Sequence, residues 1–261
     1  MPQSVAPHWD PTFAERSPCF DPLRPALERL NCKGFPSLAD LQRVADDMMV
    51  DWVQRAVRLV PVEGATREPY ERRVFESGAL TVRPDWHDLF NVLVWCVFPR
   101  AKAALNRRHV VEMEHELPPQ RGRARDALTQ FDEDGVIVLS TVPELLGLIR
   151  AFQWKQLFSE RRAQVLEHMR FLVFGHALYE KLLEPFVGVT GKALLLDIPA
   201  GTDDAISIAD GRVAEWIDAG MLLSPADLQP LPVLGIPGWY PGSLQAGFYD
   251  NATYFRRGRR T

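Results

Sequence analysis

Residues 86–109 read Trp86-His-Asp-Leu-Phe-Asn-Val-Leu-Val-Trp-Cys-Val-Phe-Pro-Arg-Ala-Lys-Ala-Ala-Leu-Asn-Arg-Arg-His109. From Leu89 to Phe98 the stretch is apolar almost all the way round a helix, which predicts a helix buried on most of its sides. It is too short to cross a bilayer, which needs about 20 apolar residues. We therefore expect the rest of the fold to be built around this helix.

Pro99 predicts a bend at the end of this first helix. A proline inside a helix costs about 3 kcal/mol, whereas one in the first turn is tolerated. The sequence after Pro99 is again rich in helix-forming residues, with Ala101, Ala104 and Leu105 available for packing. We expect a second helix that begins at Pro99.

Polar residues interrupt the apolar pattern at a few positions. His87 and Asn91 are four residues apart on one face of the first helix, beside Asp88. In the second helix Lys102, Asn106 and His109 share a face at spacings of four and three. Polar groups set into an apolar segment are where we expect a functional site.

A third helical segment carries another pair of polar residues. Trp154 to Leu183 is amphipathic and is predicted to form one long helix, which would place His176 and Glu180 four residues apart on a partly apolar surface. Gly175 would allow another element to approach closely. The full set of candidate catalytic residues is His87, Asp88, Asn91, Lys102, Asn106, His109, His176 and Glu180.

Two interpretations of these residues remain open. Catalytic groups must reach a common reacting atom, so a site requires His87, Asp88, Asn91, His109 and His176 to converge around one concavity. If the residues are structural, each will instead be paired locally, because buried polar groups need hydrogen-bond partners.

A hydrolase-type enzyme is the first functional hypothesis, because no redox or dinucleotide-binding motif is present. His87 or His109 would act as general base or metal ligand, and Asp88 would orient an imidazole or bind the metal. Asn91 and Asn106 would position substrate, and Lys102 would stabilise developing negative charge. A divalent metal is possible as cofactor, since imidazole and carboxylate suit zinc, iron and manganese. The alternative is a non-enzymatic protein that binds a protein or nucleic-acid partner.

The expected fold class is α+β, as one domain that is rich in helices and has short β-hairpins packed on a helical core. Residues 1–20 are expected to form an irregular leader over the surface, residues 21–223 the core domain, and residues 224–261 a Pro-, Gly- and aromatic-rich segment that wraps the core. Strands and helices do not alternate in the pattern of βαβ units.

Individual elements follow from local patterns. Helices are expected at 22–30, 37–49, 143–152 and 210–219, and strands at 57–62 and 191–198. Hairpins are expected at 70–82, around Glu-Ser-Gly, and at 126–140, around Asp132-Glu-Asp-Gly135. A calcium loop at Asp126 to Asp134 is disfavoured, because the acidic residues do not have the required spacing.

Composition restricts the possible partners and compartment. The 261 residues are 46% hydrophobic and 25% charged, with a net charge of −4, so nucleic acid is an unlikely partner. We expect neither a signal peptide nor membrane insertion, and three widely spaced cysteines favour a reducing cytoplasm. Nucleic-acid contacts, if they exist, would use Trp239, Tyr240 and the arginines at 121, 123, 125, 256, 257, 259 and 260.

Several motifs together resemble one bacterial family, catalogued as domain of unknown function 3025. They are His87-Asp-Leu-Phe-Asn91, Phe98-Pro-x-x-Lys102, Leu105-Asn-x-x-His109, Asp126-Ala-Leu-Thr-x-Phe-Asp-Glu-x-Gly135, Phe174-Gly-His-Ala-Leu178 with Glu180-Lys-Leu182, and Pro232-Val-Leu-Gly-Ile-Pro-Gly-Trp239. The resemblance covers about Tyr70 to Phe255 and implies no activity. The basic run after Phe255 departs from what the resemblance leads us to expect.

Overall fold

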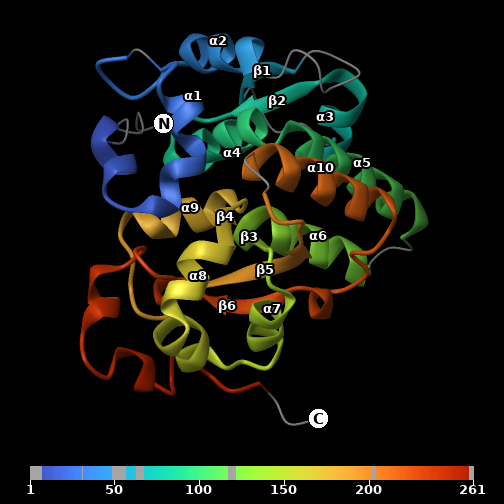
Figure 1. Cartoon of the computed structure of the whole chain (residues 1–261). Coiled ribbons are helices and arrows are strands. Elements are labelled where there is room, and N and C mark those ends of the chain that lie inside the picture. The colour runs from blue at the N-terminus through green and yellow to red at the C-terminus, as the bar shows by residue number, and fades with distance from the viewer. Residues whose placement is uncertain are drawn as a thin grey trace.

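The computed structural model describes residues 8–30, 32–48, 57–62, 68–116, 122–201 and 204–258. Helices make up most of this part of the chain, and the strands are short (Figure 1). The predicted helix-rich α+β class is therefore confirmed. None of the described helices is both long enough and apolar enough to cross a membrane.

The α-helices are α1 Arg24–Leu27, α2 Leu38–Met48, α3 Tyr70–Ser77, α4 Trp86–Val97, α5 Pro99–His115, α6 Arg123–Asp134, α7 Pro143–Arg150, α8 Arg162–His168, α9 His176–Leu183 and α10 Ala205–Asp218. The strands are β1 Arg58–Pro61, β2 Ala79–Val82, β3 Gly135–Ser140, β4 Met169–Val173, β5 Thr190–Asp197 and β6 Gln229–Pro232. Short 3₁₀ helices occupy Pro11–Glu15, Pro18–Leu23, Pro225–Asp227, Val233–Gly235, Pro241–Leu244 and Phe248–Asp250, and a π-helical turn occupies Gln156–Glu160.

Helix α4 lies at the centre of the fold, as predicted. Its residues from Asp88 to Val97 are all buried, and the carboxylate of Asp85 caps its first turn by accepting a hydrogen bond from Asp88 N at 2.9 Å. The helix contacts α2, α5 and α9. In Figure 1 it runs between the small sheet above it and the larger sheet below it.

Helix α5 begins at Pro99, as predicted, and runs beside α10. Asp210 of α10 caps it: the backbone N–H groups of Arg100 and Ala101 donate to its carboxylate at 3.2 and 2.8 Å. A negative charge is favourable at a helix N-terminus. Burial nevertheless raises the pKa of Asp210 to about 6. α10 begins earlier than the predicted residue 210, because Asp204 caps it through Ser207 N.

The small sheet consists of β1 and β2, which run parallel with α3 between them. The predicted hairpin at 70–82 is therefore wrong, as is the expectation that no strand–helix–strand unit occurs. Gly78 explains the error. It adopts a left-handed conformation with φ of 68° and ends α3, whereas the Glu-Ser-Gly pattern alone predicts the turn of a hairpin.

The larger sheet has the strand order β4-β3-β5-β6, with β3 parallel to β5 and the outer pairs antiparallel. The predicted hairpin at 126–140 is wrong, because α6 runs as far as Asp134 and β3 starts at Gly135. Ala124, Ala127 and Phe131 are buried at helical spacing on one face of α6. The prolines of β6 are tolerated because this strand lies at the sheet edge.

The long helix predicted from Trp154 to Leu183 is also wrong. The segment contains the π-helical turn, α8, strand β4 and α9. Its apolar residues fit both a helical and an alternating pattern, which local periodicity cannot separate. Antiparallel pairing with β3 makes residues 169–173 a strand, β4, instead of a helix. The paired residues run from Ser140 opposite Met169 to Val136 opposite Val173.

The two ends of the described chain contribute to the core. Phe13 and Phe20 are buried, so the N-terminal segment does not simply lie over the surface, and its 3₁₀ helices replace the expected irregular leader. Trp239, Tyr254 and Phe255 are buried at the other end.

The expected strand at 191–198 is confirmed as β5, and the expected helices at 37–49 and 143–152 are confirmed as α2 and α7. Expectations for residues 1–7, Met49, the loop at 117–121 and residues 259–261 lie outside the described residues.

Gly175, between β4 and α9, permits a close backbone approach to the end of α6 and the start of β3. A Cβ atom there would lie 2.4 Å from Glu133 O and 2.5 Å from Gly135 N. We predict that Gly175→Ala lowers the free energy of unfolding by about 1 to 3 kcal/mol, because backbone atoms of α6 and β3 must move. Urea denaturation followed by circular dichroism measures this change.

Gly147→Ala is the matched control, because Gly147 lies inside α7 with open space around its Cα atom. Alanine should raise stability there by about 0.5 to 1 kcal/mol, through its better helix propensity. Equal effects at the two positions would contradict the tight packing of Gly175 against α6.

Candidate functional site

A cavity of about 230 Å³ lies among α3, α4, α5, α6 and α9. Most of the predicted site residues line it: His87, Asp88, Asn91, Lys102, Asn106, His109 and His176. Glu180 does not line the cavity, but its Oε2 atom lies 3.2 Å from His87 Nδ1. Residues far apart in the sequence thus surround one concavity. Their catalytic roles stay a prediction.

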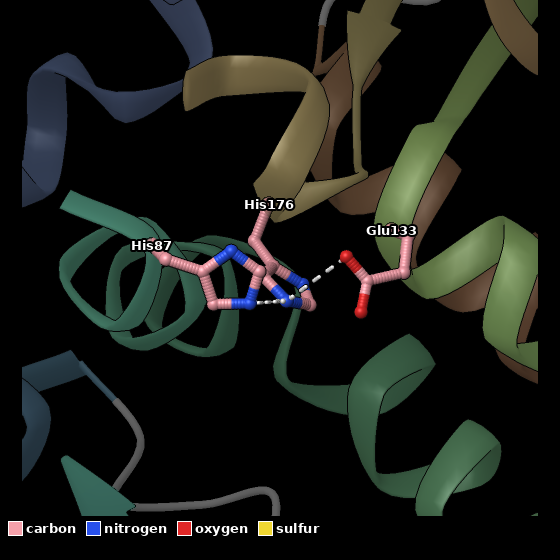
Figure 2. A group of neighbouring side chains, drawn as sticks. All are labelled: His87, Glu133 and His176. Atoms are coloured by element: carbon pink, nitrogen blue, oxygen red, sulfur yellow. Dashed lines mark hydrogen bonds and ion pairs between the residues drawn. The ribbon is translucent and has the colours of Figure 1, made fainter. Parts of the chain in front are cut away.

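Two histidines face each other in this cavity (Figure 2). His87 comes from the first turn of α4 and His176 from the first residue of α9, and their Nε2 atoms are 3.0 Å apart. Glu133, near the end of α6, places its Oε2 atom 3.7 Å from His176 Nε2. Each of the three residues offers one ligand atom, and these atoms lie within 4.8 Å of one another.

The separation of the histidine nitrogens fits a shared cation. Two nitrogens bound to one metal at about 2.1 Å, at angles of roughly 90 to 110°, lie about 3.0 to 3.4 Å apart. The observed 3.0 Å is within this range. Glu133 is 38% exposed, so its side chain has room to turn further toward the two imidazoles. Two histidines and one carboxylate can therefore bind a divalent cation here.

Carboxylates lie behind both imidazoles. Glu180 Oε2 is 3.2 Å from His87 Nδ1, and Asp132 Oδ1 is 4.0 Å from His176 Nδ1. In metal sites such a carboxylate holds the proton on one ring nitrogen, so that the other nitrogen directs its lone pair at the metal. Glu180 is close enough to hold the proton on His87 Nδ1 in this way, whereas Asp132 lies beyond hydrogen-bond distance of His176 Nδ1 and acts on that imidazole through its charge.

Lys102 connects Asp132 to the core. Its side chain is 2% exposed, and its ammonium group forms an ion pair with Asp132 and donates to Asn91 Oδ1 at 2.9 Å. It also lies 5.5 Å from the centroid of the Trp95 ring, within reach of a cation–π contact. Burial, the largest single influence, raises the pKa of Asp132, but the charge and hydrogen bond of Lys102 together with the nearby histidines outweigh it, so the pKa of Asp132 is lowered.

The electrostatics of the cluster keep His176 neutral. Burial lowers the pKa of His176 to about 4, although the negative charge of Asp132 acts in the opposite direction. Burial, followed by repulsion from Asp132, raises the pKa of Glu133. A metal ligand must be deprotonated, and a neutral imidazole meets this requirement at neutral pH.

The other predicted residues hold the walls of the cavity. Both oxygens of Asp88 accept hydrogen bonds from the guanidinium of Arg83, at 2.8 and 3.0 Å. Asn91 Nδ2 donates to the hydroxyl of Tyr70 at 3.1 Å, and Asn106 Nδ2 donates to Glu71 O at 2.8 Å. These contacts join α4 and α5 to α3 and to the segment before α4.

His109 and two carboxylates complete the lining. His109, on α5, is 3% exposed and faces the same cavity. Asp132 and Glu133 were missed as site residues, because Asp132-Glu-Asp-Gly135 has the composition of a turn. The helical spacing of Ala124, Ala127 and Phe131 would have indicated that α6 continues through them.

A larger concavity of about 570 Å³ lies near the C-terminal segment, lined by Phe152, Trp154 and Tyr254 among others. The histidines and carboxylates gather instead in the smaller cavity. We therefore place the candidate site at His87, Glu133 and His176.

The fold and the site define a helix-rich α+β protein with a partly buried cluster of histidines and carboxylates. The chain belongs to the family described as "Protein of unknown function (DUF3025)", whose model matches residues 57–259. The matched segment contains every residue of the cluster. No match was found among curated proteins or among solved structures.

The pKa of His176 predicts how stability depends on pH. Its folded value of about 4 lies below the unfolded value near 6.5, so the unfolded chain takes up this proton first as the pH falls. We predict that metal-free protein loses up to about 3 kcal/mol of stability between pH 6.5 and 4 through this group.

Urea unfolding at several pH values measures the effect, with His176→Gln as the variant and His168→Gln as the control. Subtracting the free energy of unfolding of His176→Gln from that of wild type at each pH removes the contributions of other groups. One of these is Glu133, whose raised pKa increases stability as the pH falls. If His176→Gln and wild type lose stability in parallel over this range, His176 is not held neutral by the fold.

Proposed function

We propose that this protein is a metal-dependent enzyme of the hydrolase type, in which His87, His176 and Glu133 hold one divalent cation. The observation that carries the proposal is the pair of Nε2 atoms 3.0 Å apart, with a carboxylate behind each ring. The same 3.0 Å separation allows a hydrogen bond between the two rings when no cation is bound, and Glu133 supplies the third ligand atom that a cation needs. A cation bound by His87, His176 and Glu133 explains why their ligand atoms converge.

The number of ligands supports catalysis over a structural role. Structural zinc sites use four protein ligands, whereas catalytic sites use three and leave a position for water or substrate. A cation held by these three residues would supply Lewis-acid activation of water, lowering the pKa of water to about 7 as in known catalytic metal sites. Zinc, manganese and iron(II) all accept a set of two imidazoles and one carboxylate.

The surrounding residues receive distinct roles in this proposal. Glu180 and Asp132 orient His87 and His176, and Lys102 keeps Asp132 ionised. His109 lines the cavity without belonging to the cluster, so it is the imidazole we assign to proton transfer. Asp88, Asn91 and Asn106 position the walls through the hydrogen bonds described above.

The cysteines support an expectation about the compartment. Cys19, Cys32 and Cys96 form no disulfide, and burial raises the pKa of Cys19 and Cys96 to about 12. Such thiols are unreactive and compatible with a reducing environment. We infer that the protein works in the cytoplasm.

Isothermal titration with zinc, manganese and cobalt on chelator-treated, untagged protein tests the metal site. We predict one bound cation per chain. His87→Ala, His176→Ala and Glu133→Gln should each weaken binding at least 100-fold. Glu180→Gln should weaken it by about 10- to 100-fold, the range typical of residues that orient metal ligands.

His168→Ala is the control, because His168 lies outside the cluster and contacts Thr141 and Glu167. Equal affinities for His168→Ala, His87→Ala and His176→Ala would remove the metal site. Loaded protein that binds the cation but hydrolyses none of a panel of phosphate esters, carboxylate esters and amides would favour the alternative of a binding protein.

A further inference from the structure

A second concavity, of about 950 Å³, adjoins the metal cavity. One wall is a face of the small sheet, formed by Arg58 and Val60 of β1 and by Ala79 and Thr81 of β2. The parallel register pairs Arg58 with Ala79 and Val60 with Thr81. Because side chains alternate along a strand, these four residues share one face, and Leu59 and Leu80 point into the core.

Helix α3 forms the facing wall. Tyr70, Arg73 and Ser77 line the groove and are three and four residues apart, so they lie on one side of this helix. The strand–helix–strand unit thus builds a groove between its helix and the outer face of its two strands. We call this concavity the arginine groove, after Arg58, Arg73 and Arg83, which all line it.

The arginine groove and the metal cavity share part of their lining. Tyr70, Arg83, Asp88 and Asn91 line both. A molecule that occupies the groove therefore lies next to the histidine cluster, and one of sufficient length extends from one concavity into the other.

The charges in the arginine groove do not balance. Three guanidinium groups face two carboxylates, Glu68 and Asp88, and Asp88 is engaged by Arg83. Arg58 is exposed and its guanidinium makes no ion pair to the residues that the structure describes. Like charges gathered in a concavity raise the local concentration of ions of the opposite sign.

The groove also offers an unused polar group. The Oγ1 atom of Thr81 is buried and has no hydrogen-bond partner among the described residues. Buried hydroxyls normally have a partner, from the protein, from water or from a ligand. A hydroxyl donor beside guanidinium groups is suited to an oxyanion.

We propose that the arginine groove binds an anionic group of the substrate, a phosphate or a carboxylate, while the bond to be hydrolysed lies at the metal. This substrate class rests on the proposed function. Guanidinium groups bind phosphate and carboxylate alike through paired hydrogen bonds, so the same arginines suit either anion. Thr81 contributes a hydroxyl donor, and Arg83 remains fixed by Asp88 at the boundary with the metal cavity.

Anion binding to metal-free protein tests the groove separately from the metal. Inorganic phosphate and malonate are titrated in turn by calorimetry at low salt, in the presence of chelator. We expect saturable binding of at least one anion, and the tighter of the two identifies the substrate's group. Arg58→Gln and Arg73→Gln should each weaken it at least 10-fold, and Thr81→Val several-fold.

Two further variants locate the bound anion. Arg150→Gln, an exposed arginine on α7, should bind like wild type, as should His87→Ala, which alters only the metal cavity. The proposal is overturned if no anion saturates, if Arg58→Gln and Arg73→Gln match Arg150→Gln, or if His87→Ala abolishes binding. Failure of the metal site would instead show as unchanged cation affinity in His87→Ala, with anion binding intact.

Discussion

The buried ion pair between Lys102 and Asp132 is the interaction on which this site depends. Removing a charge from water costs several kcal/mol, so each partner is tolerated only while the other is present. Lys102 also binds Asn91, and the pair therefore ties α4, α5 and α6 together. Because Asp132 Oδ1 lies 4.0 Å from His176 Nδ1, the pair that fixes three helices also places a negative charge beside one imidazole of the cluster.

The candidate site residues both converge on one cavity and form hydrogen bonds within the fold. The sequence posed them as alternatives, since residues paired within the fold were expected to be scattered. Asn91, Asn106 and Asp88 do have structural partners, and they still line one cavity with His87 and His176. A ligand for a metal must be held by further contacts, so a well-paired polar cluster in a core is compatible with a site. The pairing supplies the rigidity that coordination requires.

Local signals were sufficient for part of the fold and of the site. Features that depend only on nearby residues were predicted. They are the apolar run of α4, the break at Pro99 and the polar positions within the two helices. Asp132 and Glu133 were missed because Asp-Glu-Asp-Gly resembles a turn, while the helix there is selected by packing of Phe131. β4 was missed because its pairing with β3 comes from a segment about 30 residues away in the chain, which local periodicity does not report.

X-ray absorption spectroscopy of the cation-loaded protein tests the central claim most directly. We predict two histidine nitrogens at about 2.0 to 2.2 Å from the cation, with oxygen ligands completing the shell. Imidazole ligands are recognised by their characteristic outer-shell scattering. His176→Ala should lose one of the two imidazole contributions. A spectrum with oxygen ligands alone, or with sulfur, would show that the cation binds elsewhere and that the cluster of His87, Glu133 and His176 is not a metal site.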